Sequence, residues 1–228
     1  MKIVISLLPV LLLTYYIYKK DKHKESLYMI IFLILGGIFS AIFSYALSEF
    51  TKNIVVDNLV FKNIVFIGFK EEFIKFIVLF LICFNALEFD EIYDSIVYST
   101  FLSLGFIFIE NIIYINTLNI NFIDIVLRSI MSCGVHFALG VTMGYFIGYA
   151  KDNQINYKYF SSVTNIFLAF LIPSILHGIY DLLISLSIKY NNISYFVPCY
   201  VMIVFIVSYF MFNKYLSLRN NNFVSFTN

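Results

Sequence analysis

Apolar residues run along the chain in long blocks that short polar stretches separate. A helix needs roughly 20 apolar residues to cross the hydrocarbon core of a membrane. The first block is short, but no small-residue cleavage site follows it, so we expect it to stay as an anchor helix. The pattern predicts an all-α protein, a polytopic transmembrane helical bundle of about seven spans. The spans cover about 3–18, 27–47, 62–85, 92–115, 124–149, 159–188 and 195–213.

Composition assigns the same class. The chain has 228 residues, of which 61% are hydrophobic and only 13% charged. A soluble domain is nearer half apolar and a quarter charged. The net charge of +1 offers no electrostatic basis for binding nucleic acid. We therefore expect a single integral-membrane domain, 1–228, in contact with the lipid bilayer, with its core at about 62–188.

Basic residues in the loops predict the orientation of the bundle. Loops that stay in the cytoplasm carry an excess of lysine and arginine. Placing the N-terminus outside and the C-terminus in the cytoplasm leaves Lys52, Lys189 and, near a span end, Arg128 on the outer side. The inner side then receives Lys19, Lys20, Lys22, Lys24, Lys151, Lys158, Lys214 and Arg219.

Few ionisable residues lie inside the predicted spans, and such residues are functional candidates by default. Counting from the predicted span ends at 1.5 Å per residue places the acidic residues and the histidines among them roughly 8–18 Å below the outer face. Residues far apart in sequence thus share one layer in the outer half of the membrane. They are Glu71, Glu72, Lys75, Glu110, His136, His177 and Asp181.

Spacing predicts which of these side chains meet. Glu71 and Lys75 are four residues apart, which places them on one helix face where they can pair. His177 and Asp181 have the same spacing. Asn111 stands beside Glu110 as a possible supporting residue. Glycines near these positions would allow the helices to approach closely.

Such a cluster is suited to adding water to a carbonyl group. Adjacent Glu71 and Glu72 resist ionising together in a low dielectric, and Lys75 would favour one charge. A carboxylate in that setting is tuned toward a general base. A histidine such as His136 could hold the water or donate to a developing oxyanion. The expected reaction is peptide hydrolysis inside the membrane.

Four stretches in order resemble the PrsW intramembrane proteases, distant relatives of the CAAX prenyl endopeptidases. They are "EEFIK" (71–75), "EFDEIYDSIVYSTFLSLGFIFIENIIY" (88–114), "VHFALGVTMGYFIGYAK" (135–151) and "HGIYD" (177–181). The chain departs from the family pattern at Ser95 and Ser99, where glycine is usual, and at Ile92, where proline is common. These departures affect helix packing and leave every proposed catalytic group in place.

The resemblance implies a multi-pass endopeptidase of the bacterial cell membrane. Its implied substrate is a single-pass membrane protein, an anti-sigma factor, cut on its extracytoplasmic side as the first of two cleavages. By analogy, Glu71 or Glu72 activates water, His136 positions it, and His177 with Asp181 supports the oxyanion. Lys75, Glu110 and Asn111 would be supporting residues.

Two further questions stay open at the level of sequence. Zinc could bind to a subset of Glu72, Glu110, His136, His177 and Asp181. No HExxH is present, so we favour a metal-free glutamate mechanism without a cofactor, with zinc as the alternative. A proton-coupled transporter also places carboxylates in spans, although we find no internal repeat. A non-catalytic scaffold or immunity protein could share the fold.

Overall fold

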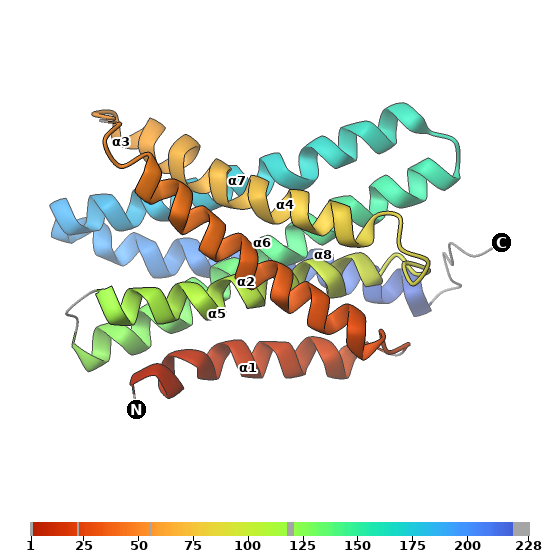
Figure 1. Ribbon diagram of the computed structural model, residues 1–228, viewed down its shortest axis with the longest axis horizontal. Coiled ribbons are helices and arrows are strands. Elements are labelled where there is room, and N and C mark those ends of the chain that lie inside the picture. Colours follow the sequence, from red (N-terminus) through yellow and green to blue (C-terminus); the bar gives the residue numbers. More distant parts are fainter. Residues whose placement is uncertain (1, 22, 55, 118–120, 221–228) are drawn as a thin grey trace.

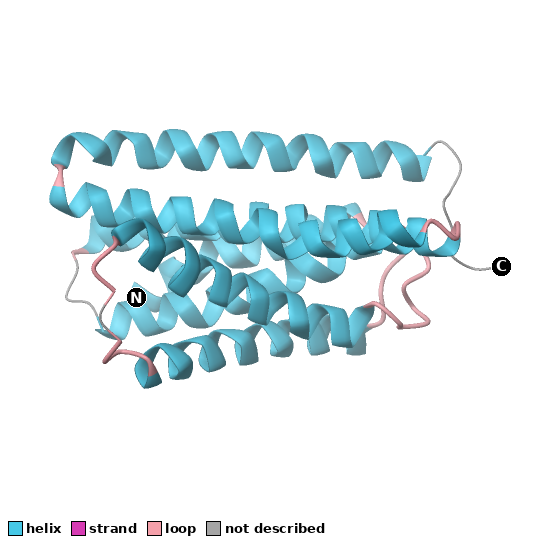
Figure 2. Ribbon diagram, turned by 90° about the horizontal axis from the view of Figure 1, so that it is seen from above, coloured by secondary structure: helices cyan, strands magenta, loops and turns pink. Residues whose placement is uncertain are grey.

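A computed structural model describes residues 2–21, 23–54, 56–117 and 121–220. These residues form a helical bundle with no strand in the described ranges (Figure 2). Lys22 and the tail after Asn220 lie outside the described residues. In chain order, the elements are α1 (Lys2–Lys20), α2 (Leu27–Phe50), α3 (Leu59–Phe61), the π-helical η1 (Lys62–Phe69), α4 (Lys70–Cys83), α5 (Asp94–Thr117), α6 (Phe122–Ile155), α7 (Tyr159–Lys189), the short 3₁₀ helix η2 (Asn191–Tyr195) and α8 (Phe196–Asn220).

Every predicted apolar block coincides with a helix or with two consecutive ones, which confirms the all-α class. Five helices in the described part of the chain are long and apolar enough to cross a membrane: α2, α5, α6, α7, and α8 joined to η2. Counting α1 and the continuous η1–α4 segment as well, successive helices alternate in direction, so α1 begins and α8 ends at opposite ends of the bundle (Figure 1). The count of seven spans and the orientation of the termini stay predictions.

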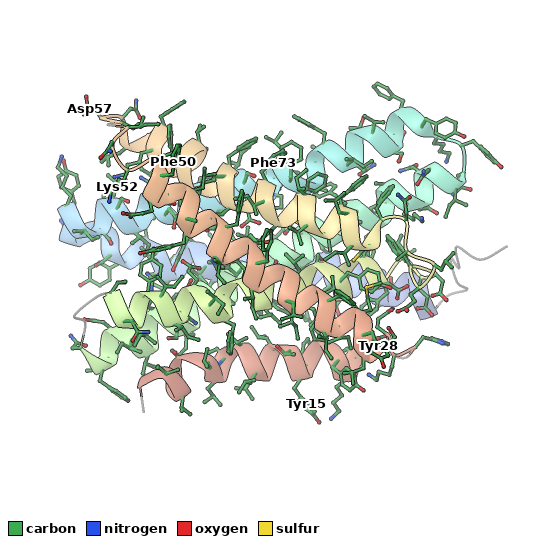
Figure 3. The ribbon with its side chains drawn as sticks, in the orientation of Figure 1. Tyr15, Tyr28, Phe50, Lys52, Asp57 and Phe73 are labelled. Carbon is green, nitrogen blue, oxygen red and sulfur yellow. The ribbon has the colours of Figure 1, made fainter. Side chains whose placement is uncertain are left out.

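The outside of the bundle is strongly apolar. The labelled side chains of Tyr15, Tyr28 and Phe73 project outward (Figure 3) and are 62%, 79% and 39% exposed. A soluble protein rarely exposes apolar surface on this scale, whereas lipid accepts it without penalty. Together with the five apolar helices, this surface identifies a multi-pass membrane protein.

The polar residues between the blocks start the next helices. The Ser26 hydroxyl accepts a hydrogen bond from the Met29 backbone N–H at 3.1 Å, capping α2. The Asn121 side chain accepts one from Asp124 N–H at 2.9 Å, capping α6. Because the first N–H groups of a helix have no partner within it, such caps define where each span begins.

Small residues join α5 to α6 at the centre of the bundle. Added Cβ atoms at Gly140, Gly144 and Gly148 of α6 would collide with Ser103, Ser99 and Ser95 of α5, respectively. Both series repeat every four residues, so the two antiparallel helices interlock along one face. Lipid supplies no hydrophobic drive for helix association, and close packing of small residues replaces it. The serines that depart from the family pattern therefore still serve tight packing.

A second close approach joins η1 to α7 beside the candidate site. A Cβ on Gly68 would collide with the backbone of Gly178 and Ser174, and a Cβ on Gly178 would collide with Ile64. Gly68 lies three residues before Glu71, and Gly178 follows His177 directly. This contact therefore sets the distance between the glutamates and His177.

We expect Gly68→Ala to lower the thermal stability of the purified protein, because the new methyl group has only backbone to displace. Overpacking of this kind costs about 1–3 kcal/mol. The matched control is Gly134→Ala on α6, where a Cβ would meet only Val201, at 3.7 Å. Thermal unfolding in detergent measures both variants. Equal melting temperatures for Gly68→Ala and Gly134→Ala would contradict the prediction.

At the other end of the bundle, the loop between α1 and α2 is tied to α5. The Tyr98 hydroxyl donates to Glu25 Oε2 at 2.7 Å. Burial raises the pKa of the Glu25 carboxyl to about 7; hydrogen bonds from Tyr98 and Asp94 oppose that rise, while Asp21 and Glu88 add to it. Since the folded state binds this proton more tightly than the unfolded chain does, folding is favoured at low pH. The advantage is lost as the pH rises from about 4.5 toward 7.

We therefore expect the melting temperature to fall between pH 5 and pH 8, and Glu25→Gln to flatten that fall. A glutamine keeps an acceptor for Tyr98 and carries no charge. Glu49→Gln is the control, because Glu49 is exposed on α2 and pairs with Lys52. A Glu25→Gln profile parallel to that of the unmodified protein would count against the prediction.

Candidate active site

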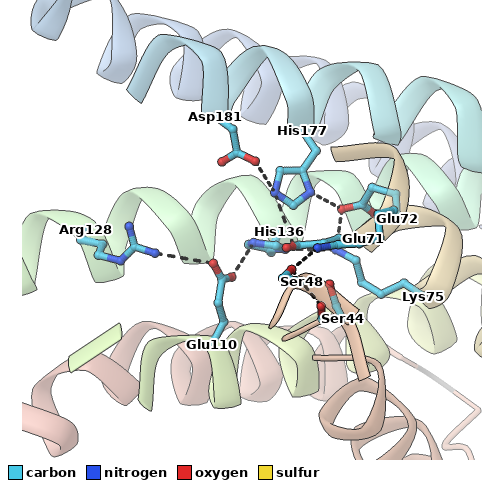
Figure 4. A network of polar contacts seen from close by, with 11 residues as sticks. Ser44, Ser48, Glu71, Glu72, Lys75, Glu110, Arg128, His136, His177 and Asp181 are labelled. Atoms are coloured by element: carbon cyan, nitrogen blue, oxygen red, sulfur yellow. Dashed lines mark hydrogen bonds and ion pairs between the residues drawn. The ribbon is translucent and has the colours of Figure 1, made fainter. Parts of the chain in front are cut away.

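The structure brings the predicted site residues together from four helices (Figure 4). Glu71 and Glu72 lie in the first turn of α4, and Glu110 lies on α5. His136 comes from the middle of α6, and His177 and Asp181 come from α7. The shared depth that the sequence predicted corresponds to a real cluster, which lies toward the end of the bundle where α5 ends and α6 begins.

Glu72 is the most connected member of the cluster. Its side chain is fully buried, and Oε1 accepts a hydrogen bond from Lys75 Nζ at 2.5 Å. The same oxygen lies 2.7 Å from His177 Nδ1. The second oxygen, Oε2, is buried and has no hydrogen-bond partner in the described part of the chain. One oxygen of Glu72 thus joins α4 to α7, and the other remains available to a ligand.

The predicted pairing of Lys75 with Glu71 is wrong. Lys75 pairs with Glu72, three residues earlier. Both side chains face the bundle interior, while Glu71, about 100° around the helix, turns toward a cavity. Lys75 Nζ also lies 3.2 Å from His136 Nδ1 and 4.3 Å from the centre of the Phe106 ring. The lysine charge is therefore balanced by Glu72 and shared between two helices.

His136 is held on its other side by Glu110. His136 Nε2 lies 3.0 Å from Glu110 Oε2, and Arg128 lies 3.5 Å from the other oxygen of that carboxylate. The Arg128 guanidinium stacks 3.4 Å from the centre of the Tyr114 ring. The sequence places Arg128 near a span end, and its role in the cluster was not predicted. Its spacing of eight residues from His136, about two helical turns, is the pattern that indicates neighbouring positions on α6.

His177 meets three carboxylates. Besides Glu72, its Nε2 lies 3.4 Å from Asp181 Oδ2, which confirms the predicted contact within α7. The same nitrogen is 3.9 Å from Glu71 Oε2. The rings of His136 and His177 stand almost perpendicular, with centres 4.9 Å apart. The two histidines therefore face each other at the middle of the cluster.

Asn111 does not join the cluster, so its predicted supporting role there is wrong. Its side-chain amide donates to the Ser6 backbone carbonyl at 3.2 Å. Asn111 lies about 100° around α5 from Glu110 and faces α1 instead. It fastens the first helix to the core.

Two cavities meet at Glu71. The smaller, of about 130 Å³, is lined by both histidines, Asp181 and Arg128. At about 30 Å³ per molecule in the liquid, it has room for a few waters. The larger, of about 270 Å³, lies between α2, η1 and α5. Glu71 and Glu110 line both cavities, whereas fully buried Glu72 lines neither.

The cluster contains a group that fits a metal ion. Ligand atoms of Glu72, His136 and His177 lie within 4.8 Å of one another. Two histidines, a glutamate and an open position form a common catalytic zinc site. The unpartnered Oε2 of Glu72 supplies a free donor there. Glu110 and Asp181 each contact one of the histidines, as the carboxylates that orient metal ligands do.

A bundle of apolar helices that encloses glutamates, histidines and a water-sized cavity has the parts that a membrane-embedded hydrolase requires. Residues 25–211 match the family described as "PrsW family intramembrane metalloprotease". The chain belongs to this family, and the resemblance seen in the four sequence motifs is confirmed.

Curated relatives agree. "Protease PrsW" of Oceanobacillus iheyensis is 37% identical over 178 residues, 78% of this chain and 80% of that protein. "Protease PrsW" of Clostridioides difficile is 28% identical over 93% of this chain and 90% of its own. The protein of that name from Bacillus subtilis is 32% identical over 83% and 84%. No solved structure matches the chain significantly.

These findings support a peptidase of the bacterial membrane that acts within the bilayer. The family description names a metalloprotease, and the Glu72, His136 and His177 group gives such an ion a place to bind.

The buried Glu72–Lys75 pair yields a stability prediction. Removing one partner of a buried ion pair leaves an uncompensated charge and costs about 3–5 kcal/mol. We expect Lys75→Met to lower the free energy of unfolding by that amount. The double variant Glu72→Gln, Lys75→Met should recover part of the loss, because neither charge remains. A double-mutant cycle from denaturant unfolding in detergent measures the coupling, and strictly additive losses would contradict it.

Proposed function

We propose that this chain is an intramembrane endopeptidase that hydrolyses a peptide bond in a single-pass membrane protein. The observation that carries the proposal is the position of Glu71, whose carboxylate lines both cavities and faces His177. A group between a water-sized space and a larger one is placed to bring water to a bound peptide. An anti-sigma factor, cut near the outer face, is the substrate that the family resemblance supports.

Glu71 is the proposed general base. Its carboxylate takes a proton from a cavity water as the water oxygen attacks the peptide carbonyl carbon. It then delivers that proton to the amide nitrogen as the carbon–nitrogen bond breaks, leaving a carboxylic acid and an amine. The pairing of Glu72 with Lys75 and His177 leaves it unsuited to this exchange.

Glu72, His136 and His177 are the proposed holders of a zinc ion. When bound there, such an ion would lower the pKa of a water molecule to about 7 and would polarise a carbonyl group. Asp181 and Glu110 fix the orientation of the two histidine rings through the contacts described above. Arg128 lies 3.5 Å from the other oxygen of the Glu110 carboxylate and helps to hold that group against His136.

The test uses purified protein in lipid vesicles with a panel of labelled single-pass substrates. We expect Glu71→Gln to lower the cleavage rate by about 100-fold or more, since general base catalysis contributes about 10²–10⁴. Glu72→Gln, His136→Ala and His177→Ala should lose cleavage and bound zinc together. Asp152→Asn is the control, because Asp152 contacts Asn156 at the opposite end of α6.

Chelation separates the two mechanisms. Cleavage that a strong zinc chelator abolishes and added zinc restores would support the metal-dependent mechanism. Cleavage that survives chelation but not Glu71→Gln would restore the metal-free one. Undiminished cleavage by Glu71→Gln would overturn the proposed base, and transport of a solute without any cleavage would overturn the endopeptidase.

A further inference from the structure

The larger of the two cavities has features that water activation does not use. Its wall on one side is α2, through Ala41, Ser44 and Ser48, and on the other Ile67 and Glu71. Its volume of about 270 Å³ is close to the lower end of the range for ligand pockets, about 300–1,000 Å³. The cavity is therefore large enough for part of a peptide, whereas its smaller neighbour is not.

The path of α2 creates this space. α2 touches α5 at Gly37 and Gly105, where an added Cβ would collide with the backbone of the other helix. α2 runs obliquely across the bundle (Figure 1), so it separates from α5 beyond this crossing point. The cavity begins at Ala41, one turn past Gly37. The tight contact of α2 with α5 at Gly37 and Gly105 thus leaves a gap between the two helices at the level of Glu71.

Ser44 is the unusual residue in this wall. It belongs to a series with Ser40 and Ser48, spaced four residues apart on α2. The hydroxyls of Ser40 and Ser48 donate to the carbonyls of Gly36 and Ser44, one turn earlier. The Ser44 hydroxyl is buried, lines the cavity and has no hydrogen-bond partner among the described residues. Figure 4 shows Ser44 and Ser48 beside the cluster.

A peptide bond can be cut only where the substrate backbone is exposed to the attacking water, which an intact helix prevents. Unwinding frees backbone carbonyl groups, and each unpaired one costs several kcal/mol in a medium without water. An unpaired hydroxyl donor within the same membrane layer as Glu71 would satisfy one of these carbonyls. The unwound substrate has a carbonyl group without a donor, and Ser44 has a hydroxyl without an acceptor in the part of the chain that the structure describes. Each can therefore supply the partner that the other lacks.

We propose that the larger cavity binds the unwound substrate backbone next to the scissile bond, and that the Ser44 hydroxyl donates a hydrogen bond to a substrate carbonyl. Lys70 donates to Ser48 and so fixes the far side of the wall. Ala41, Ile67, Phe106 and Ile113 form the apolar part, which receives one substrate side chain. This inference rests on the endopeptidase function proposed above.

The first test compares Ser44→Ala with Ser40→Ala on a substrate that the unmodified protein cleaves. Loss of one hydrogen bond predicts a fall in kcat/KM of about 3- to 10-fold for Ser44→Ala. Ser40→Ala should leave kcat/KM unchanged, because in the described structure the Ser40 hydroxyl donates to the Gly36 carbonyl of its own helix. Equal kcat/KM values for Ser44→Ala and the unmodified protein would overturn the role of Ser44.

The second test concerns the space itself. Ala41→Leu fills the cavity, so it should shift substrate preference toward smaller residues beside the cut, measured with substrates that differ at that position only. In a Glu71→Gln, Cys199→Ser background, Ser44→Cys should form disulfides with single-cysteine substrates only within about two residues of the cut. Cross-linking at distant positions, or an unchanged preference in Ala41→Leu, would overturn the cavity assignment while the endopeptidase stands. A chain that cleaves no peptide would overturn both.

Discussion

The buried ion pair between Glu72 and Lys75 is the constraint on which the rest of the site depends. Both side chains are fully enclosed, and charges in a low dielectric must be paired and hydrogen-bonded to persist there. The Glu72–Lys75 ion pair alone does not provide all the hydrogen bonds that the two buried groups need, and the histidines provide further ones. His177 contacts Glu72, and Lys75 contacts His136. Three helices are thereby linked through one carboxylate and one ammonium group.

Such a network requires close approach of the helices, since each contact is short. Close approach in turn needs small residues, because larger side chains would hold the backbones apart. Gly68 against Gly178 brings the glutamates to His177, and the serine–glycine series brings α5 to α6. The second of these contacts holds Glu110 of α5 beside His136 of α6, with Glu110 Oε2 3.0 Å from His136 Nε2. The close helix packing of this protein therefore positions the residues of its candidate active site.

Local sequence patterns predicted the helices and most members of the cluster, because both follow from where polar residues interrupt apolar blocks. These patterns gave Lys75 the wrong partner, since spacings of three and four residues are both compatible with pairing. Only the rotation of α4 in the bundle selects Glu72. The prediction for Asn111 was wrong for the same reason, because its position next to Glu110 does not indicate which face of α5 points into the cluster. Ser44 gave no signal, because a serine in a span is ordinarily bonded to its own helix.

The two adjacent glutamates have different roles because consecutive residues on a helix point in different directions. The step of about 100° places Glu72 among its partners and Glu71 at the junction of the two cavities. Glu72 is fixed by its contacts and can hold its neighbours in place. Among the described residues, Glu71 has one ion-pair contact, to a His177 nitrogen 3.9 Å away, and its carboxylate is partly exposed to the cavities. A general base must exchange protons with water, so it cannot also be the residue that is held by several ion pairs and hydrogen bonds. The adjacent pair meets both demands at the same depth in the membrane.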